Sequence, residues 1–281
     1  MPTLPVQFFC IILHCQKRTT VRQNDNNSLF TPVEIGIILL STFVLFVVFA
    51  FVTGFLNESV SMLLGELMMV IPAVVFTVYK RMPFAATFRF NRVNLQQTAA
   101  TFLFFIPLFI LADELDRLIQ MLFPMPTELL DALYNVMTFN SIGHAVALIV
   151  AGVFVAALSE EMLFRGVLQH TLEKFRDPAM AIVSSAVFFT LAHFNPWASI
   201  QILLLGLVFG YVTWKSQSIL PAILLHGLNN LLSLIMINLP EESLNWYARG
   251  DHVNWIWVLL SLLCIAPIFR LIAKVFFNSR D

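Results

Sequence analysis

The sequence predicts an all-α membrane protein, built as a bundle of about eight transmembrane helices. Of its 281 residues, 59% are hydrophobic and only 12% are charged, whereas soluble domains average about 25% charged residues. The mean hydropathy of +0.83 agrees with this composition. Several apolar runs are long enough to cross about 30 Å of hydrocarbon, and they lack the alternation of a membrane β-barrel. These features argue against a soluble enzyme, a disordered chain or a nucleic-acid binder.

The N-terminus differs from the rest of the chain. Residues 1–32 are expected to form a cytoplasmic or interfacial segment, and residues 33–281 a single polytopic membrane domain. Lys17 and Arg18 follow the first apolar run instead of preceding it, which is not the pattern of a signal peptide. The spacing of the three cysteines predicts no disulfide or metal framework. They are Cys10, Cys15 and Cys264.

Eight apolar runs are expected to be helices. In a bilayer, only helices and closed β-barrels satisfy all backbone hydrogen bonds. The third and fifth runs are short and could be tilted or partly re-entrant. Residues 112–141 form the longest polar stretch, where Thr127 followed by Glu128 predicts a short interfacial helix. The eight runs are 33–56, 59–79, 97–112, 142–163, 179–194, 198–214, 219–239 and 254–275.

The distribution of Lys and Arg predicts the orientation. With a cytoplasmic N-terminus, 14 of the 16 basic residues fall on the cytoplasmic side, and only Arg117 and Arg249 lie outside. A wrong number of spans would mix the two sides, so we expect a multi-pass protein of the cell membrane with both termini in the cytoplasm. The 14 residues are Lys17, Arg18, Arg22, Lys80, Arg81, Arg89, Arg92, Arg165, Lys174, Arg176, Lys215, Arg270, Lys274 and Arg280.

Ionisable residues inside membrane spans are costly and mark functional sites, and here they concentrate between residues 159 and 230. The fourth span ends with Glu160, Glu161 and Arg165. On one helix Glu161 and Arg165 are i,i+4 neighbours and can pair. Glu160 points about 100° away and is left free to exchange a proton.

Two later spans add imidazoles and an amide. Phe189 and His193 lie in the fifth span, and His226 and Asn230 share a face of the seventh. A free carboxylate with imidazole and amide donors can activate water and stabilise an oxyanion. The spacing therefore predicts a hydrolytic centre between these helices.

The expected span limits leave these groups at different depths. Glu160 should lie near the cytoplasmic boundary if its span ends at residue 163. His193 should lie about 22 Å along a helix that begins at Pro178. The groups meet only if the fifth helix begins outside the hydrocarbon or the fourth helix is drawn inward.

These three motifs, in this order on successive apolar helices, resemble the CAAX protease and bacteriocin-processing family of the type II CAAX prenyl protease kind. The resemblance covers about residues 142–240. It implies a catalytic cavity that faces the cytoplasm in an intramembrane endopeptidase. The implied reaction cleaves a peptide, prenylated or membrane protein substrate near the cytoplasmic membrane face. The motifs are Glu160-Glu161-x-x-x-Arg165, Phe189-x-x-x-His193 and His226-x-x-x-Asn230.

The resemblance also implies roles for individual residues. Glu160 would activate the hydrolytic water with help from His193, while His226 and Asn230 would hold the oxyanion. No cofactor is expected, since the sequence has no HExxH motif. Zinc stays an alternative, because two histidines and one glutamate, here Glu160, His193 and His226, can form a catalytic zinc set. The residues expected to shape the site are Glu161, Arg165 and Phe189.

Two other function classes remain open. A non-catalytic membrane partner, such as a bacteriocin-immunity or scaffold protein, could keep the same motifs. A proton-coupled transporter would usually show repeated, broken helices, which the sequence does not suggest. The expected partners are the protein substrate and the lipid bilayer, with no nucleic acid. Gly206 and Gly210 form a GxxxG pair, which permits close packing within the bundle or in a homodimer.

The charge distribution gives a direct test of the topology. In a background without the native cysteines, we expect Glu128→Cys to react with a membrane-impermeant thiol reagent added outside intact cells. Lys215→Cys should react only after the membrane is opened, because its loop is expected in the cytoplasm. External labelling of Lys215→Cys would contradict this orientation.

Overall fold

The computed structural model describes residues 29–55 and 58–277, and this part of the chain is almost wholly helical. Seven of its helices are long and apolar enough to cross a membrane, and an eighth apolar helix has 15 residues. The all-α membrane bundle predicted from composition is thereby confirmed. The expectations for residues 1–28, including Cys10 and Cys15, and for Arg280 lie outside the described residues.

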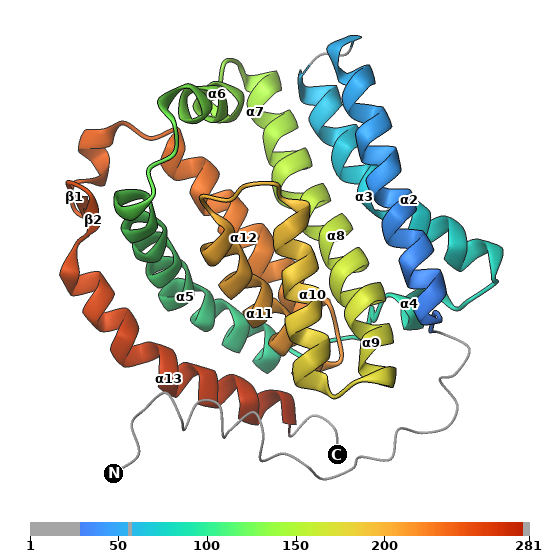
Figure 1. The fold of residues 1–281 in the computed structure, drawn as a ribbon. Coiled ribbons are helices and arrows are strands. Elements are labelled where there is room, and N and C mark those ends of the chain that lie inside the picture. The colour runs from blue at the N-terminus through green and yellow to red at the C-terminus, as the bar shows by residue number, and fades with distance from the viewer. Residues whose placement is uncertain (1–28, 56–57, 278–281) are drawn as a thin grey trace.

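Helices α2 (Pro32–Val52) and α3 (Glu58–Tyr79) form the first hairpin, at one side of the bundle (Figure 1). Thr31 caps α2 in a capping box with Glu34, and Pro32 occupies its first turn. The Glu34 carboxylate also accepts from Lys80 Nζ at 2.7 Å, which ties the start of α2 to the end of α3. A short 3₁₀ turn, Thr53–Phe55, follows α2, and the four-residue helix α4 (Phe84–Thr87) follows α3.

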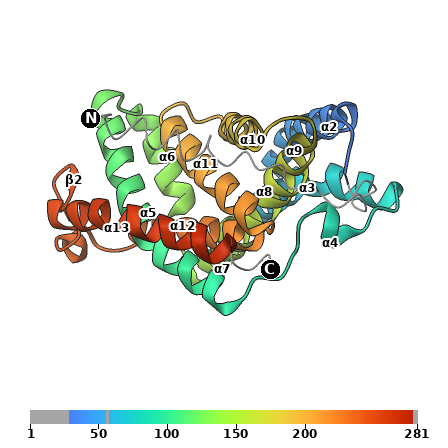
Figure 2. The ribbon, with the colours of Figure 1, turned by 90° about the horizontal axis from the view of Figure 1, so that it is seen from below.

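The opposite side consists of α5 (Leu95–Leu122) and the last helix α13 (Trp255–Phe277), which lie against each other in both views (Figures 1 and 2). The third span is thus 28 residues long, because the helix continues past residue 112 through acidic residues. Cys264 in α13 is free and exposed. The short helix predicted at Thr127 is present as α6 (Thr127–Met137).

A small hairpin of β1 (Ala248–Arg249) and β2 (His252–Val253) follows the 3₁₀ turn Glu241–Leu244 and packs on the end of α5. Glu114 on α5 accepts from the Val253 backbone N–H at 2.7 Å. Tyr247 donates its hydroxyl to Asp113 at 2.8 Å. Burial and the neighbouring Asp113 charge both raise the pKa of Tyr247, so the hydroxyl stays protonated and keeps donating.

One continuous helix of 34 residues, Ile142–Phe175, runs through the centre of the bundle. It consists of α7 (Ile142–Leu148), a π-helical segment (Ile149–Val155), α8 (Ala156–Glu161), a second π-helical segment (Met162–Gln169) and α9 (His170–Phe175). The expected end of the fourth span at residue 163 was wrong. No proline or glycine cap stops the chain there, and the first strong stop is Asp177-Pro178.

Three helices complete the bundle: α10 (Pro178–Ala192), α11 (Ser199–Ser216) and α12 (Leu220–Ile237). Gly206 and Gly210 on α11 let its backbone approach α10. A Cβ at Gly206 would lie 3.2 Å from Ala186 Cβ, and one at Gly210 would lie 3.0 Å from Ile182 Cγ2. This glycine face is buried inside the chain, as in the first of the two alternatives, so a homodimer through Gly206 and Gly210 has no free surface to use.

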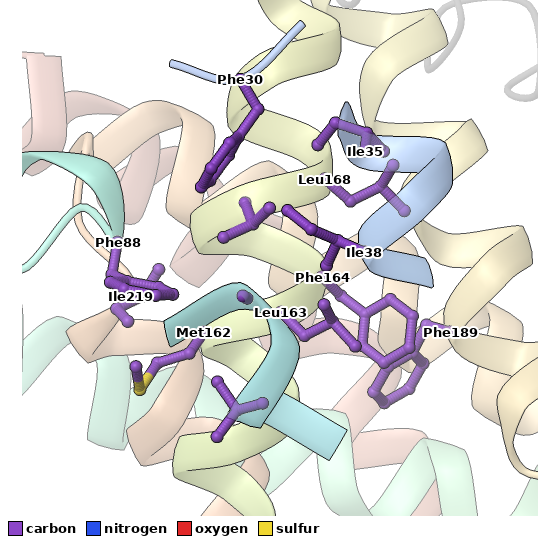
Figure 3. Close-up of a cluster of buried hydrophobic side chains, with 13 residues drawn as sticks. Phe30, Ile35, Ile38, Phe88, Met162, Leu163, Phe164, Leu168, Phe189 and Ile219 are labelled. Atoms are coloured by element: carbon purple, nitrogen blue, oxygen red, sulfur yellow. The ribbon is translucent and has the colours of Figure 1, made fainter. Parts of the chain in front are cut away.

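The long helix is the centre of one of the two largest apolar clusters in the described chain. Phe164 and Phe189 meet edge to face, with ring centroids 5.3 Å apart. Ile35 and Ile38 of α2 pack beside them (Figure 3). The second cluster joins α5, α11, α12 and α13. The polar site lies where the long helix, α10, α11 and α12 meet.

Candidate active site

The two adjacent glutamates of α8 occupy different surroundings. Glu160 is 6% exposed and Glu161 is fully buried, as is Arg165 one turn further on. Arg165 Nη1 donates to Glu161 Oε1 at 2.8 Å, which is the i,i+4 pair predicted from the spacing. Glu160 has no such partner, and its Oε2 is buried without a hydrogen bond. The helix thus separates a neutralised carboxylate from an unpaired one.

Glu161 Oε1 also contacts His226 on α12, with Nδ1 at 3.0 Å. This contact joins residues 65 positions apart and was not predicted from the sequence. Since Arg165 holds Glu161 as a carboxylate acceptor, His226 Nδ1 carries the proton of this hydrogen bond. The His226 ring stacks on Phe209 with centroids 5.4 Å apart. Its position and tautomer are therefore both restricted.

Besides Glu161, the Arg165 guanidinium contacts α11 and α10. Nη2 donates to the Gly206 carbonyl at 3.1 Å, and the guanidinium carbon lies 4.2 Å from the centroid of the Phe189 ring. A buried guanidinium needs such acceptors and ring faces, because it cannot lose its charge. One turn on, Gln169 donates to the Gly210 carbonyl at 2.9 Å. The GxxxG pair thus presents two backbone acceptors to the long helix.

Glu160 and His193 lie at the same depth, with Nε2 of the histidine 3.7 Å from Oε2 of the glutamate. Glu160 stands 15 residues before the end of its helix at Phe175, and His193 stands 15 residues after Pro178. At 1.5 Å per residue each lies about 22 Å from the same helix–helix turn. The depth mismatch expected from the sequence disappears because the long helix continues to Phe175.

His193 caps the C-terminus of α10, where its Nδ1 lies 2.8 Å from the Phe189 carbonyl oxygen. A carbonyl only accepts, so Nδ1 carries the proton and Nε2 of the neutral ring is an acceptor. This Nε2 faces Glu160. With an ionised Glu160 and a neutral His193 ring, Oε2 and Nε2 are therefore two acceptors 3.7 Å apart.

Asn230 lies one turn beyond His226 on α12. Its amide donates to the carbonyl of Gly152 at 2.9 Å, in the first π-helical segment. Long π-helical stretches are rare and recur at functional sites, because they change which carbonyls are free. One N–H of the Asn230 amide is left for another acceptor. Contacts thus connect six of the seven predicted residues where the long helix, α10 and α12 meet, and Asn230 contacts the long helix at Gly152.

The alternative zinc set is not assembled in this arrangement. The described residues contain no group of three His, Cys, Asp or Glu side chains placed to hold a metal ion. Glu160 and His193 approach each other, whereas His226 is bound to Glu161. A site of Glu160, His193 and His226 would require His226 to use its other nitrogen or to leave Glu161.

Sequence reasoning missed Glu66, on α3. Its Oε2 is buried without a hydrogen-bond partner, and its charge interacts with that of Glu160. The signal was present, since Glu66 is an ionisable residue in the middle of the apolar run 59–79. The same rule that selected Glu160 also applies to Glu66.

The fold and this cluster define a polytopic membrane protein with an ionisable centre buried among its helices. Residues 142–232 match the family model of the Rce1-like type II CAAX prenyl endopeptidases. The matched segment contains all three motifs and confirms the family predicted from them. No curated protein and no solved structure gave a significant match to the chain.

The Glu161 pair is expected to support the fold as well as the site. Glu161→Gln removes the charge opposite Arg165, and loss of one partner of a buried pair costs about 3–5 kcal/mol. We expect that loss of unfolding free energy in chemical denaturation of the purified protein in micelles. Glu160→Gln should leave stability nearly unchanged, because Glu160 has no hydrogen-bonded partner to lose.

A double variant serves as the control. Glu161→Gln combined with Arg165→Met removes both charges, so it should recover part of the stability lost in the single variant. Equal stability of Glu160→Gln and Glu161→Gln would contradict the different surroundings of the two glutamates.

Proposed function

We propose that the protein is an intramembrane endopeptidase that hydrolyses a peptide bond with a water molecule activated by Glu160. The observation that carries this proposal is the convergence of Glu160 Oε2 and His193 Nε2, two acceptors 3.7 Å apart. A water molecule 2.8 Å from both would be close to the usual length of an O–H···O hydrogen bond. Its two protons would point to the protein, and its lone pairs would face the substrate carbonyl.

The proposed steps conserve atoms and protons. Glu160 takes a proton as the water oxygen bonds to the carbonyl carbon, and the carbonyl oxygen becomes an oxyanion. When the intermediate collapses and the C–N bond breaks, the protonated Glu160 returns that proton to the leaving amine. His193 holds the water in line throughout. Neither step requires a metal ion.

Two groups on α12 suit the oxyanion. Asn230 has one amide N–H left after its bond to Gly152, and His226 Nε2 can donate when its ring carries both protons. Preorganised donors of this kind are worth most in a dry site, where they need no reorganisation during the reaction. The contact with Glu161 fixes the position of His226, and the contact with Gly152 fixes the position of Asn230.

An apolar pocket of about 740 Å³ beside the site suits the hydrophobic part of a substrate. It lies between α2, the second π-helical segment and the end of α10, where Phe194 and Asn195 follow His193. The volume is within the range of ligand sites. We propose that it receives the apolar segment of a membrane-associated peptide, such as a prenyl group or a transmembrane segment, and that cleavage occurs on the cytoplasmic side.

The first test separates chemistry from folding. Glu160→Gln removes the base but keeps the shape, so we expect hydrolysis to fall to background in reconstituted vesicles with a membrane-anchored peptide. Substrate binding and the unfolding midpoint should remain. The exposed Glu128→Gln on α6 is the matched control and should cleave normally. Near-normal turnover of Glu160→Gln would refute Glu160 as the base.

The second test compares two neighbouring amides. Asn230→Ala removes a proposed oxyanion donor, so its turnover should fall by about 10²–10³-fold with little change in KM. Asn229 donates to the Asn230 side-chain oxygen at 3.5 Å and, within the described residues, to no backbone carbonyl. Asn229→Ala should therefore lower turnover far less. Equal loss in the two variants would contradict an oxyanion role for Asn230.

Elemental analysis of the active protein decides the metal question. We expect hydrolysis to persist after thorough chelation. Stoichiometric zinc whose removal and return switches activity off and on would overturn the metal-free mechanism. That result would also be expected to make His193→Ala and His226→Ala lose metal and activity together.

A further inference from the structure

A second, smaller pocket of about 240 Å³ lies between α2 and α3 and belongs to neither the base nor the oxyanion groups. All of its lining comes from α2, α3 and the turn after α2. Most of that lining is apolar, but two polar side chains on α3 interrupt it. They are Ser61 and Glu66.

Both of these side chains have unused hydrogen-bonding atoms. Ser61 Oγ and Glu66 Oε2 are buried without a hydrogen-bond partner from the described residues. The buried carboxylates Glu161 and Glu173 each pair with an arginine, although Glu161 Oε2 also has no hydrogen-bond partner among the described residues. A buried polar atom without a partner is costly, and buried water molecules commonly satisfy such atoms.

The pocket adjoins the proposed base. Helix α3 packs on α8 and on the first π-helical segment, where a Cβ at Gly152 would lie only 2.7 Å from Met62 Cε. Glu66 interacts electrostatically with Glu160. The other charged or titratable groups near Glu160 are His193, Arg165 and Glu161, none of which lines this pocket.

The pocket lies beside the large apolar pocket. Phe46 and Met69 line both spaces, whereas Ser61 and Glu66 line only the small one. A substrate segment seated in the large pocket would therefore leave the small one open. Hydrolysis consumes one water for each bond cleaved, so an apolar site needs a supply that the substrate does not block.

We infer that the α2–α3 pocket is a water-binding site that supplies Glu160, with Ser61 and Glu66 as the side chains that hold the water. This inference rests on the proposed hydrolytic function. Its volume can hold several molecules, since a water molecule occupies about 30 Å³ in the liquid. Glu66 acts here as a positioning residue and does not touch the reacting bond.

The kinetic test uses two substitutions at one position. Glu66→Leu removes both hydrogen-bonding oxygens, so kcat should fall about tenfold or more while KM stays within about twofold. Glu66→Gln keeps groups that bind water and should retain most of the activity. Glu34→Gln removes the ion pair with Lys80 and keeps a side-chain oxygen for the Thr31 capping box. It is the matched carboxylate control and should cleave normally.

A labelling test does not depend on catalysis. In a background without the native cysteines, Ser61→Cys should react with a small water-soluble thiol reagent, because the thiolate forms only where water reaches it. Val75→Cys, on an exposed apolar face of the same helix, should react far more slowly. Adding Glu66→Leu should slow the labelling of Ser61→Cys. If Glu66→Leu does not fold, Ser61→Val takes its place and should lower kcat without raising KM.

Three results would overturn the inference. They are an unchanged kcat in Glu66→Leu, an equal loss in Glu66→Gln and Glu66→Leu, and labelling of Ser61→Cys as slow as that of Val75→Cys. An equal loss would mean that the charge of Glu66 is needed rather than its bound water. If the wild type cleaves nothing while Ser61→Cys still labels rapidly, the proposed function fails and the water site stands.

Discussion

The buried Glu161 carboxylate is the point on which the site depends. Its Oε1 accepts from Arg165 and from His226, so one atom joins the long helix to α12. Arg165 extends the connection to α11 through the Gly206 carbonyl and to α10 through the ring of Phe189. A charge in this interior would be prohibitive alone. Every helix that carries a motif contributes a group that stabilises the Glu161 charge, either directly or through Arg165. The helices therefore cannot shift independently.

Helix length is the second constraint. The chain makes one turn between Phe175 and Pro178, and equal lengths of helix on either side bring Glu160 opposite His193. The long helix measures about 51 Å, well beyond the roughly 30 Å of hydrocarbon. Its charged final turns can therefore stand outside the hydrocarbon while Glu160 stays within it. A helix that ended at residue 163 would leave Glu160 without His193.

The sequence was sufficient for features that depend on local spacing. The helices followed from the apolar runs, and the Glu161–Arg165 pair followed from i,i+4 geometry. The contact of His226 with Glu161 could not be predicted, since it depends on the packing of α12 against the long helix. The end of that helix was misplaced because its charged turns at Glu173 and Lys174 resemble a loop in hydropathy. Glu66 was overlooked although it met the criterion used for Glu160.

The pairing of Glu161 also explains how the fold tolerates Glu160 beside it. A turn of about 100° per residue points adjacent carboxylates in different directions. Arg165 and His226 therefore satisfy one without reaching the other, and the Oε2 atom of Glu160 keeps no partner. Glu160 Oε2 is thus an unused acceptor next to His193 Nε2, the acceptor of the neutral ring. Two acceptors facing each other are complementary to a molecule with two protons to donate, and water is the smallest molecule that satisfies both.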